Sequence, residues 1–286
     1  MNGVARVVAY GRMIRFSHSV FALPFALASV VLAVEHRLDW TQVGWILVAM
    51  VGARSAAMGF NRLADQLIDA RNPRTAGREL PRGVLSRAEV WSFVLLSSAA
   101  LVFAAWRLNT LCLALSPVAL AIVFGYSYTK RFTPFSHLFL GLALGVAPVG
   151  AWIAIRGRLD LPPVVLGLAV LAWTAGFDII YACQDAEFDR SEGLHSIPAR
   201  LGIGRALFVS RSLHVITVAL LASLYSLVAI HPLYLAGVAG VAGLLAYEQS
   251  LVKADDLSRV DAAFFTVNGW VSAAYFVLTL AARLLA

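Results

Sequence analysis

Long apolar stretches separated by short polar breaks dominate the pattern of residues along the chain. Each stretch is close to the ~20 residues that an α-helix needs to cross a bilayer, and the alternation expected of a membrane barrel is absent. We predict an all-α, multi-pass membrane protein that forms a single domain over residues 1–286. The sequence predicts about nine spans, at about residues 17 to 34, 43 to 64, 88 to 106, 110 to 128, 137 to 155, 161 to 183, 206 to 229, 232 to 250 and 263 to 283.

The composition agrees with a bilayer environment. Hydrophobic residues make up 60% of the chain and charged residues 14%, and the mean hydropathy is +0.79. These values lie outside the range of soluble domains. Three arginines before the first apolar run give it the look of a signal peptide, but its small-x-small site at Ala26-Leu27-Ala28 lies inside the run. We therefore expect this segment to be the first permanent helix.

Basic residues are distributed unequally between the two ends of the predicted spans. Of the 23 lysines and arginines, 17 fall on the side of the N-terminus, 5 fall on the other side, and Arg54 lies within a span. The positive-inside rule then places the N-terminus and the two long polar loops in the cytoplasm. We expect the protein to lie in the inner membrane of a bacterium. This asymmetry also explains the net charge of +7, so we expect membrane lipid and no nucleic acid as a partner.

Acidic residues are grouped where the second and sixth predicted spans end. Spacings of four, or of seven and then four, bring side chains back to one face of a helix. The two groups are Asn61, Asp65 and Asp69, and Asp178, Asp185 and Asp189. A carboxylate near hydrocarbon costs about 2.5 to 3.5 kcal/mol at a helix centre, so these groups require compensation.

Magnesium is the compensation that this chemistry favours. Mg²⁺ usually binds one or two carboxylates, several waters and the phosphates of a substrate. Two facing acidic clusters therefore suit a diphosphate bridged by magnesium ions. The alternative is that the aspartates solvate helix ends or pair with nearby arginines, and the repetition of the pattern in two places favours the metal.

Several basic side chains follow the acidic groups. Arg74 and Arg78 lie in the loop after Asp69. One guanidinium group can donate two parallel hydrogen bonds to the oxygens of a phosphate. Lys130 ends the run Tyr126-Ser127-Tyr128-Thr129-Lys130, which we predict to lie at the same cytoplasmic level as the loop after Asp69. Arg54 lies two turns inside an apolar segment, on the face of the first acidic group, and an ionisable residue at such a position is a functional candidate. The predicted partner of Arg54 is the carboxylate or phenol of a substrate that accepts the transferred group. The alternative is an ion pair with Asp178.

Together these motifs resemble the signature set of the UbiA superfamily of intramembrane prenyltransferases. The set comprises Asn61-x-x-x-Asp65-x-x-x-Asp69, Asn72-Pro73-Arg74-Thr75 with Arg78, Tyr126-x-x-x-Lys130, and Asp178-x-x-Tyr181-x-x-x-Asp185-x-x-x-Asp189. The order of the motifs and the number of helices agree over nearly the whole chain. One departure is Glu79, where the family's loop usually reads Arg-Pro-Leu-Pro, and it removes no motif residue. The resemblance implies a bundle of nine helices with cytoplasmic cap loops.

The resemblance also implies a role for each motif residue. Asp65, Asp69, Asp185 and Asp189 match magnesium-binding positions, and we expect these four and Asp178 to be catalytic. Arg78 and Lys130 match diphosphate contacts, and Asn61, Tyr126 and Arg74 are expected beside them. Arg54, Asn61, Tyr126 and Asp178 match positions that line the acceptor or guide ionisation, and Tyr181 is expected at the acceptor as well. Tyr126 and Tyr181 would shield an allylic cation with their ring faces, and ordinary packing is the alternative.

The implied reaction joins a polyprenyl diphosphate to an aromatic acceptor. The stretch from Arg12 to Pro24 resembles the 4-hydroxybenzoate polyprenyltransferase branch, which includes a group placed in the futalosine route to menaquinone. The acceptor is thus 4-hydroxybenzoate in quinone biosynthesis or, alternatively, 1,4-dihydroxy-6-naphthoate. Two other classes stay open: a CDP-alcohol-type phosphotransferase, whose Asp-Gly-x-x-Ala-Arg run is missing, and a transporter, which would not need arginine-rich loops after each acidic group.

Overall fold

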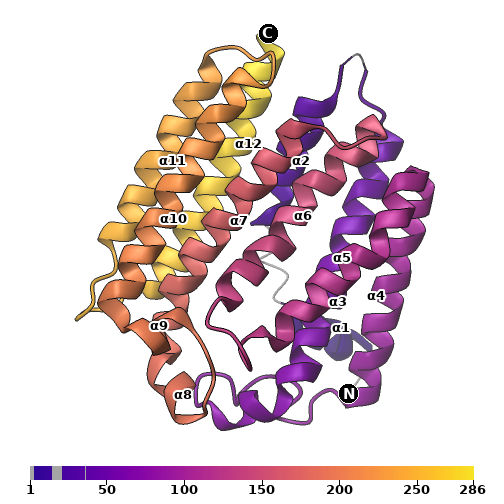
Figure 1. Ribbon diagram of the computed structural model, residues 1–286. Coiled ribbons are helices and arrows are strands. Elements are labelled where there is room, and N and C mark those ends of the chain that lie inside the picture. Colours follow the sequence, from indigo (N-terminus) through magenta and orange to yellow (C-terminus); the bar gives the residue numbers. More distant parts are fainter. Residues whose placement is uncertain (1–2, 15–20, 36) are drawn as a thin grey trace. The chain divides into compact units, whose positions relative to one another are not determined.

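The computed structural model describes residues 3–14, 21–35 and 37–286, and these residues form helices joined by turns and loops (Figure 1). The prediction of an all-α protein is confirmed. Twelve α-helices are described: α1 Gly3–Met13, α2 Ala22–Ala33, α3 Trp40–Arg71, α4 Arg87–Leu108, α5 Thr110–Thr129, α6 Ser136–Arg156, α7 Leu161–Ala182, α8 Ala186–Ser191, α9 Ile197–Leu201, α10 Ile203–Ser223, α11 Leu233–Ser250 and α12 Asn268–Leu284. Short 3₁₀ turns at Cys183–Asp185 and Leu224–Ser226 follow α7 and α10, and a π-helix at Ala262–Val267 precedes α12.

Each of the nine predicted spans overlaps one of these helices. Within the described part of the chain, seven helices are long and apolar enough to cross a membrane. The two other predicted spans correspond to α2, with 12 residues, and α11, with 18 residues. The beginning of the first predicted span, at residues 17 to 20, lies outside the described residues. The helices agree with an integral membrane protein.

The contacts divide the chain into two compact units. The first unit comprises the described residues of Met1–Ser19 and Trp40–Tyr128, and the second comprises those of Val20–Asp39 and Thr129–Ala286. Each unit is described by itself below. The expectation of one domain over residues 1–286 stays a prediction.

In the first unit, α3 packs closely along α4. Gly52 permits this approach, because a Cβ atom there would lie 2.8 Å from the carbonyl oxygen of Ser97. Small residues at such contacts are typical of helix pairs in membranes. α5 joins the pair through the rings of Phe60 and Phe124, whose centroids are 4.5 Å apart. The start of α4 is fixed by a capping box between Ser86 and Glu89.

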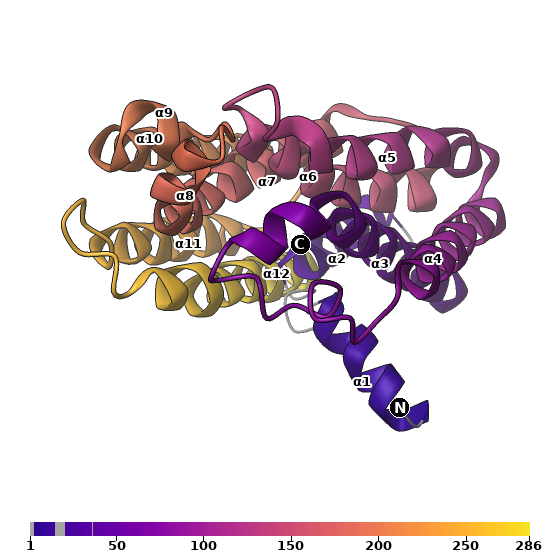
Figure 2. The ribbon, with the colours of Figure 1, turned by 90° about the horizontal axis from the view of Figure 1, so that it is seen from below.

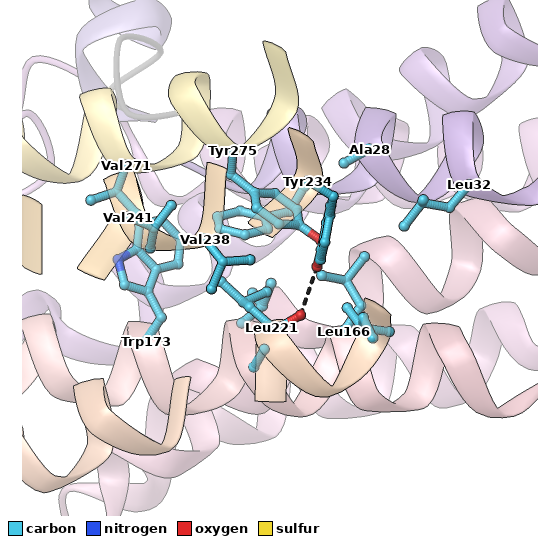
Figure 3. Packing of buried hydrophobic residues seen from close by; sticks show 14 of the residues in the cluster. Ala28, Leu32, Leu166, Trp173, Leu221, Tyr234, Val238, Val241, Val271 and Tyr275 are labelled. Atoms are coloured by element: carbon cyan, nitrogen blue, oxygen red, sulfur yellow. Dashed lines mark hydrogen bonds between the residues drawn. The ribbon is translucent and has the colours of Figure 1, made fainter. Parts of the chain in front are cut away.

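In the second unit, α7 is the central helix and packs against α6 and α10. A Cβ atom at Gly141 or Gly145 would lie within 2.6 Å of an α7 carbonyl oxygen, so these glycines allow α6 and α7 to touch along their backbones. Large buried side chains fill the space between α7, α11 and α12, and the hydroxyl of Tyr234 donates to the carbonyl of Leu221 over 2.8 Å (Figure 3).

A buried polar chain also ties three helices of the second unit together. Trp173 of α7 donates its indole N–H to Oδ1 of Asn268 over 2.7 Å, and Nδ2 of Asn268 donates to Oε1 of Glu248 over 2.8 Å. Asn268 and Glu248 are fully buried. The second carboxyl oxygen of Glu248 has no hydrogen-bond partner among the described residues. This chain is a polar crosslink inside an otherwise apolar core.

The short helices α8 and α9 lie at the lower end of α7 and α10 (Figures 1 and 2). Ser196 caps α9 by accepting a hydrogen bond from the N–H of Ala199 over 3.3 Å. The turn Glu192–His195 joins the two short helices. This end of the second unit contains the second acidic group.

Candidate active site

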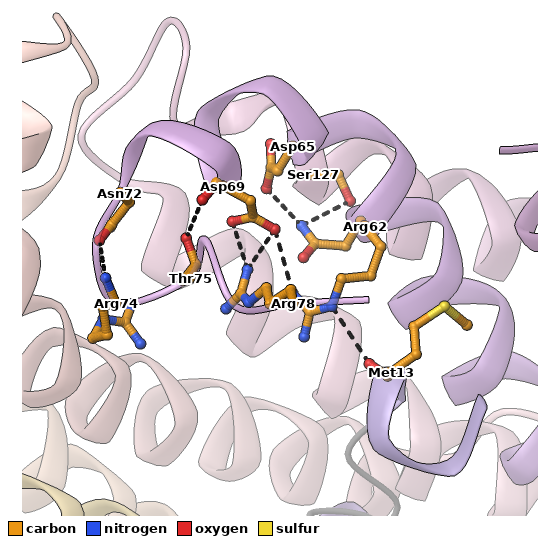
Figure 4. A network of polar contacts seen from close by, with 10 residues as sticks. Met13, Arg62, Asp65, Asp69, Asn72, Arg74, Thr75, Arg78 and Ser127 are labelled. Atoms are coloured by element: carbon orange, nitrogen blue, oxygen red, sulfur yellow. Dashed lines mark hydrogen bonds and ion pairs between the residues drawn. The ribbon is translucent and has the colours of Figure 1, made fainter. Parts of the chain in front are cut away.

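The first acidic group lies on the last turns of α3 (Figure 4). Nδ2 of Asn61 donates to Oδ2 of Asp65 over 3.0 Å, as four-residue spacing in a helix requires. The same nitrogen lies 3.5 Å from Oγ of Ser127 on α5. Asn61 is buried and Asp65 is half-buried. Asn61 therefore connects an acidic side chain of α3 to the neighbouring helix.

Arginine side chains compensate the charge of Asp69. One guanidinium nitrogen of Arg78, Nη1, donates to both carboxylate oxygens of Asp69 over 2.6 and 2.7 Å. Nη1 of the buried Arg62 lies 3.9 Å from Oδ2 of Asp69. Arg62 is not among the site residues predicted from the sequence, because its one-residue offset from Asn61 gave no signal for a site role. Nε of Arg78 is buried and has no hydrogen-bond partner among the described residues, so it can donate to a ligand.

The segment after α3 returns Arg78 to Asp69. Oγ1 of Thr75 donates to the carbonyl oxygen of Asp69 over 3.0 Å. Oδ1 of Asn72 accepts the backbone N–H of Arg74 over 2.9 Å, which is a side-chain turn typical of asparagine. The side chain of Arg74 is exposed. The turn therefore accounts for the position of Arg78, and the predicted contact of Arg74 with diphosphate stays a prediction.

Arg54 and Tyr126 are half-buried residues of the first unit, on α3 and α5 respectively. The position of Arg54 two helical turns before Asn61 agrees with the predicted face. The acceptor role of both residues, and the alternative pairing of Arg54 with Asp178, stay predictions.

The second acidic group lies where α7 gives way to α8. The 3₁₀ turn at Cys183–Asp185 interrupts the α-helix between Asp178 and Asp185. Because a 3₁₀ turn has 3.0 residues per turn, the α-helical spacing used to place these residues on one face does not hold across it. Asp185 and Asp189 are nonetheless both buried, with 6% and 2% of their surfaces exposed.

Lys130 lies beside Asp189, with Nζ 4.0 Å from Oδ2. That distance is at the limit of an ion pair, and 40% of the lysine side chain is exposed. Oδ2 of Asp189 is buried and has no hydrogen-bond partner among the described residues. The second group thus contains a buried anionic oxygen that can accept a ligand.

Asp178 contacts a histidine that is not among the site residues predicted from the sequence. Nδ1 of His137 on α6 lies 2.6 Å from Oδ2 of Asp178. The imidazole is fully buried, whereas 20% of the aspartate side chain is exposed. Nε2 of His137 accepts the N–H of Ile197, at a distance of 3.4 Å. The sequence separation of 41 positions between His137 and Asp178 gave no spacing signal, and only an apolar helix with a single histidine pointed to it.

Tyr181, the predicted acceptor residue of the second unit, stacks on Phe264 of the π-helix. The ring centroids are 4.2 Å apart and the planes are inclined by 30°. Phe264 also contacts Phe177 edge to face, with centroids 5.2 Å apart. Packing and a role at the acceptor are both compatible with this stack.

The two groups provide paired carboxylates that suit a metal shared with a substrate. Among the described side chains, no three His, Cys, Asp or Glu residues gather so that they could hold a metal ion. Magnesium usually needs only one or two protein carboxylates when phosphates and water complete its shell. Asp185 with Asp189 fits this requirement, because a buried oxygen of Asp189 lacks a donor. At Asp69 a metal would share the carboxylate with Arg78.

The chain is similar to known proteins over most of its length. The model of the UbiA prenyltransferase family matches residues 22–271. The 4-hydroxybenzoate octaprenyltransferase of Pasteurella multocida (strain Pm70) is 28% identical over 274 residues, which are 94% of this chain and 93% of that protein.

Solved structures are also similar. The apo structure of a UbiA homolog from Aeropyrum pernix K1 has a TM-score of 0.83 and 35% identity, and it covers 94% of this chain and 97% of that chain. The structure of a UbiA homolog from Archaeoglobus fulgidus bound to DMAPP and Mg²⁺ has a TM-score of 0.74 and 21% identity, covering 97% and 99% of the two chains. The second likeness is one of fold.

Proposed function

Because the chain belongs to the UbiA prenyltransferase family, we propose that it transfers a polyprenyl group from polyprenyl diphosphate to an aromatic hydroxy acid such as 4-hydroxybenzoate. The observation that supports this most is that the family match, over residues 22–271, includes both acidic groups and every predicted site residue. The acceptor is taken from the names of relatives that are 28% identical over most of their length.

The proposed donor is a diphosphate bound with magnesium. The Archaeoglobus fulgidus homolog has been solved with DMAPP and Mg²⁺ and with GPP and Mg²⁺, and the paired aspartates here suit the same ion. We propose that Asp65, Asp69, Asp185 and Asp189 hold it. Bound magnesium would supply neutralisation of the charge that develops on the departing diphosphate.

The chain's own residues bind the diphosphate and guide the reaction. The buried Nε of Arg78 and the ammonium group of Lys130 donate to phosphate oxygens, with Asn61, Tyr126 and Arg74 beside them. The C1–O bond breaks and diphosphate leaves with the electron pair. A ring carbon of the acceptor then bonds to C1, and the ring proton passes to a carboxylate, for which we propose Asp178. The faces of Tyr126 and Tyr181 would stabilise the allylic cation.

Arg54 is the proposed ligand for the acceptor's carboxylate. It is a basic residue two turns inside an apolar span, and an arginine binds a carboxylate through two parallel hydrogen bonds. In Arg54→Ala we expect the KM for 4-hydroxybenzoate to rise by about 10- to 100-fold, the typical cost of a lost charged hydrogen bond, while the KM for diphosphate changes less than twofold. Equal increases in both KM values would contradict the assignment.

The decisive experiment uses the full chain in lipid nanodiscs. The protein is incubated with geranyl diphosphate, Mg²⁺ and either 4-hydroxybenzoate or 1,4-dihydroxy-6-naphthoate, and the products are identified by mass spectrometry. We expect a mass increase of one geranyl group on 4-hydroxybenzoate, and none with EDTA. If only 1,4-dihydroxy-6-naphthoate gives product, the naphthoate becomes the assigned acceptor in place of 4-hydroxybenzoate. Product from neither acceptor would refute the proposal.

We further propose that the protein lies in the bacterial cytoplasmic membrane with its N-terminus in the cytoplasm. The support is the distribution of 17 basic residues against 5. Single cysteines introduced at Glu79 and Arg158, with Cys112 and Cys183 replaced by serine, should differ in labelling by a membrane-impermeant maleimide on intact cells. Labelling at position 158 alone is expected, and labelling at position 79 alone would reverse the topology.

A further inference from the structure

We propose that His137 is a positioning residue that orients Asp178 and couples it to the turn that holds Lys130 and Asp189. The inference rests on the proposed function, in which Asp178 is the proposed base. All the residues concerned belong to the second unit, and His137 lies in none of the sequence motifs named above.

The hydrogen bonds of His137 define its tautomer. A backbone N–H can only donate, so Nε2 must present its lone pair to Ile197. The proton of the neutral ring therefore lies on Nδ1, which donates to Oδ2 of Asp178 over 2.6 Å. The ring is fully buried and held at both nitrogens. As a result one oxygen of Asp178 is fixed, and the partly exposed carboxylate is oriented.

A single short turn connects this pair to two other predicted site residues. The N–H of Leu194 donates to the carbonyl oxygen of Asp189 over 2.8 Å, and the N–H of His195 donates to that of Lys130 over 2.7 Å. The N–H of Ile197 then donates to His137. Three amide groups within four residues thus contact a residue assigned to the metal, a residue assigned to the diphosphate, and the histidine that is bonded to the proposed base.

This arrangement gives His137 a role beyond packing. A turn that binds Asp189 and Lys130 can move only if the bond from Ile197 to His137 adapts, and Asp178 is attached to the same ring. Removing the imidazole would leave Asp178 free to rotate and would release one of the three anchors of the turn. A histidine that served only to fill space would have neither effect.

The first test separates positioning from stability by substitution. His137→Leu removes both hydrogen bonds, whereas His137→Gln offers an N–H and an oxygen in their place. For His137→Leu we expect kcat to fall by about 10- to 100-fold, the range for residues that orient functional side chains. The KM for geranyl diphosphate should change less than twofold, and His137→Gln should recover most of kcat. His231→Asn, which replaces an exposed histidine elsewhere in the unit, is the control and should match the wild type.

The second test needs no activity and so separates this inference from the proposed function. Hydrogen–deuterium exchange of the peptide that contains residues 194–197 should be faster in His137→Leu than in the wild type and close to normal in His137→Gln. Unchanged exchange in His137→Leu would overturn the coupling. Normal kcat in folded His137→Leu, with only a lower Tm, would overturn the positioning role. If the wild type forms no product, the proposed function fails and the exchange result alone decides the coupling.

Discussion

The two acidic groups differ in how their buried charge is compensated. In the first group, Nη1 of Arg78 donates to both oxygens of Asp69 over 2.6 and 2.7 Å, and Arg62 lies nearby. In the second group, Nζ of the half-buried Lys130 lies 4.0 Å from Oδ2 of Asp189, and this oxygen lacks a hydrogen-bond donor among the described residues. Asp69 is therefore balanced by the chain's own arginines, whereas Asp189 depends more on what binds there.

The largest expected effect is common to both groups. Asp69→Asn and Asp189→Asn should each lower kcat/KM for geranyl diphosphate by about 100- to 1,000-fold, the usual cost of losing one charge-stabilising group. Steady-state assays in nanodiscs measure it. Asp255→Asn, which changes an exposed acid of the second unit, should keep wild-type activity. Near-normal activity of either site variant would remove that group from the reaction.

The same two substitutions should have opposite effects on stability without magnesium. Asp69→Asn removes the anion that pairs with the buried Arg62 and the half-buried Arg78, and breaking a buried pair costs about 3 to 5 kcal/mol. Asp189→Asn removes a poorly compensated buried charge, so the Tm in detergent with EDTA should rise. Thermal unfolding followed by tryptophan fluorescence distinguishes them. Changes of Tm in the same direction would break the comparison.

Lys130→Ala should have a smaller effect, because the lysine is distant from Asp189 and partly exposed. We expect the KM for geranyl diphosphate to rise by about 3- to 10-fold, which is 0.7 to 1.4 kcal/mol of lost charge interaction. Raising the ionic strength should reduce the difference from the wild type, since salt screens exposed charges. A loss of activity as large as that of Asp189→Asn would show that Lys130 has a greater share in the second group.

Ser127→Ala should have the smallest effect. Its Oγ lies 3.5 Å from Asn61, at the limit of hydrogen-bond distance. Asn61 retains its 3.0 Å bond to Asp65. We expect kcat/KM to change less than about twofold, in line with a weak hydrogen bond. A tenfold loss, measured with the same assay, would mean that the contact with α5 is needed to position the first group.

Local spacing predicted those parts of the molecule that depend on a single helix. The nine apolar segments correspond to helices. Each is long enough and hydrophobic enough to be predicted as a helix without knowledge of its neighbours. The contact between Asn61 and Asp65 follows from the four-residue period within α3. Even there the 3₁₀ turn at Cys183–Asp185 was not foreseen, since no residue in it excludes an α-helix.

Contacts between different helices could not be predicted from spacing along the sequence. The bond of His137 to Asp178 joins α6 to α7, and it depends on the rotation of both helices about their axes. Burial of Arg62 beside Asp69 likewise depends on α1, because Nε of Arg62 lies 3.4 Å from the carbonyl oxygen of Met13. The stretch from Arg15 to Val20, used to assign the acceptor branch, lies outside the described residues.

The buried contact between Glu248 and Asn268 has a consequence for biogenesis. α11 is not among the helices apolar enough to cross a bilayer by composition alone, and it contains the fully buried Glu248. The amide that compensates this carboxyl is Asn268 at the start of α12, which the ribosome makes 20 residues later. We therefore expect the translocon to release α11 into lipid only together with α12, so that the last two helices enter the membrane as a hairpin.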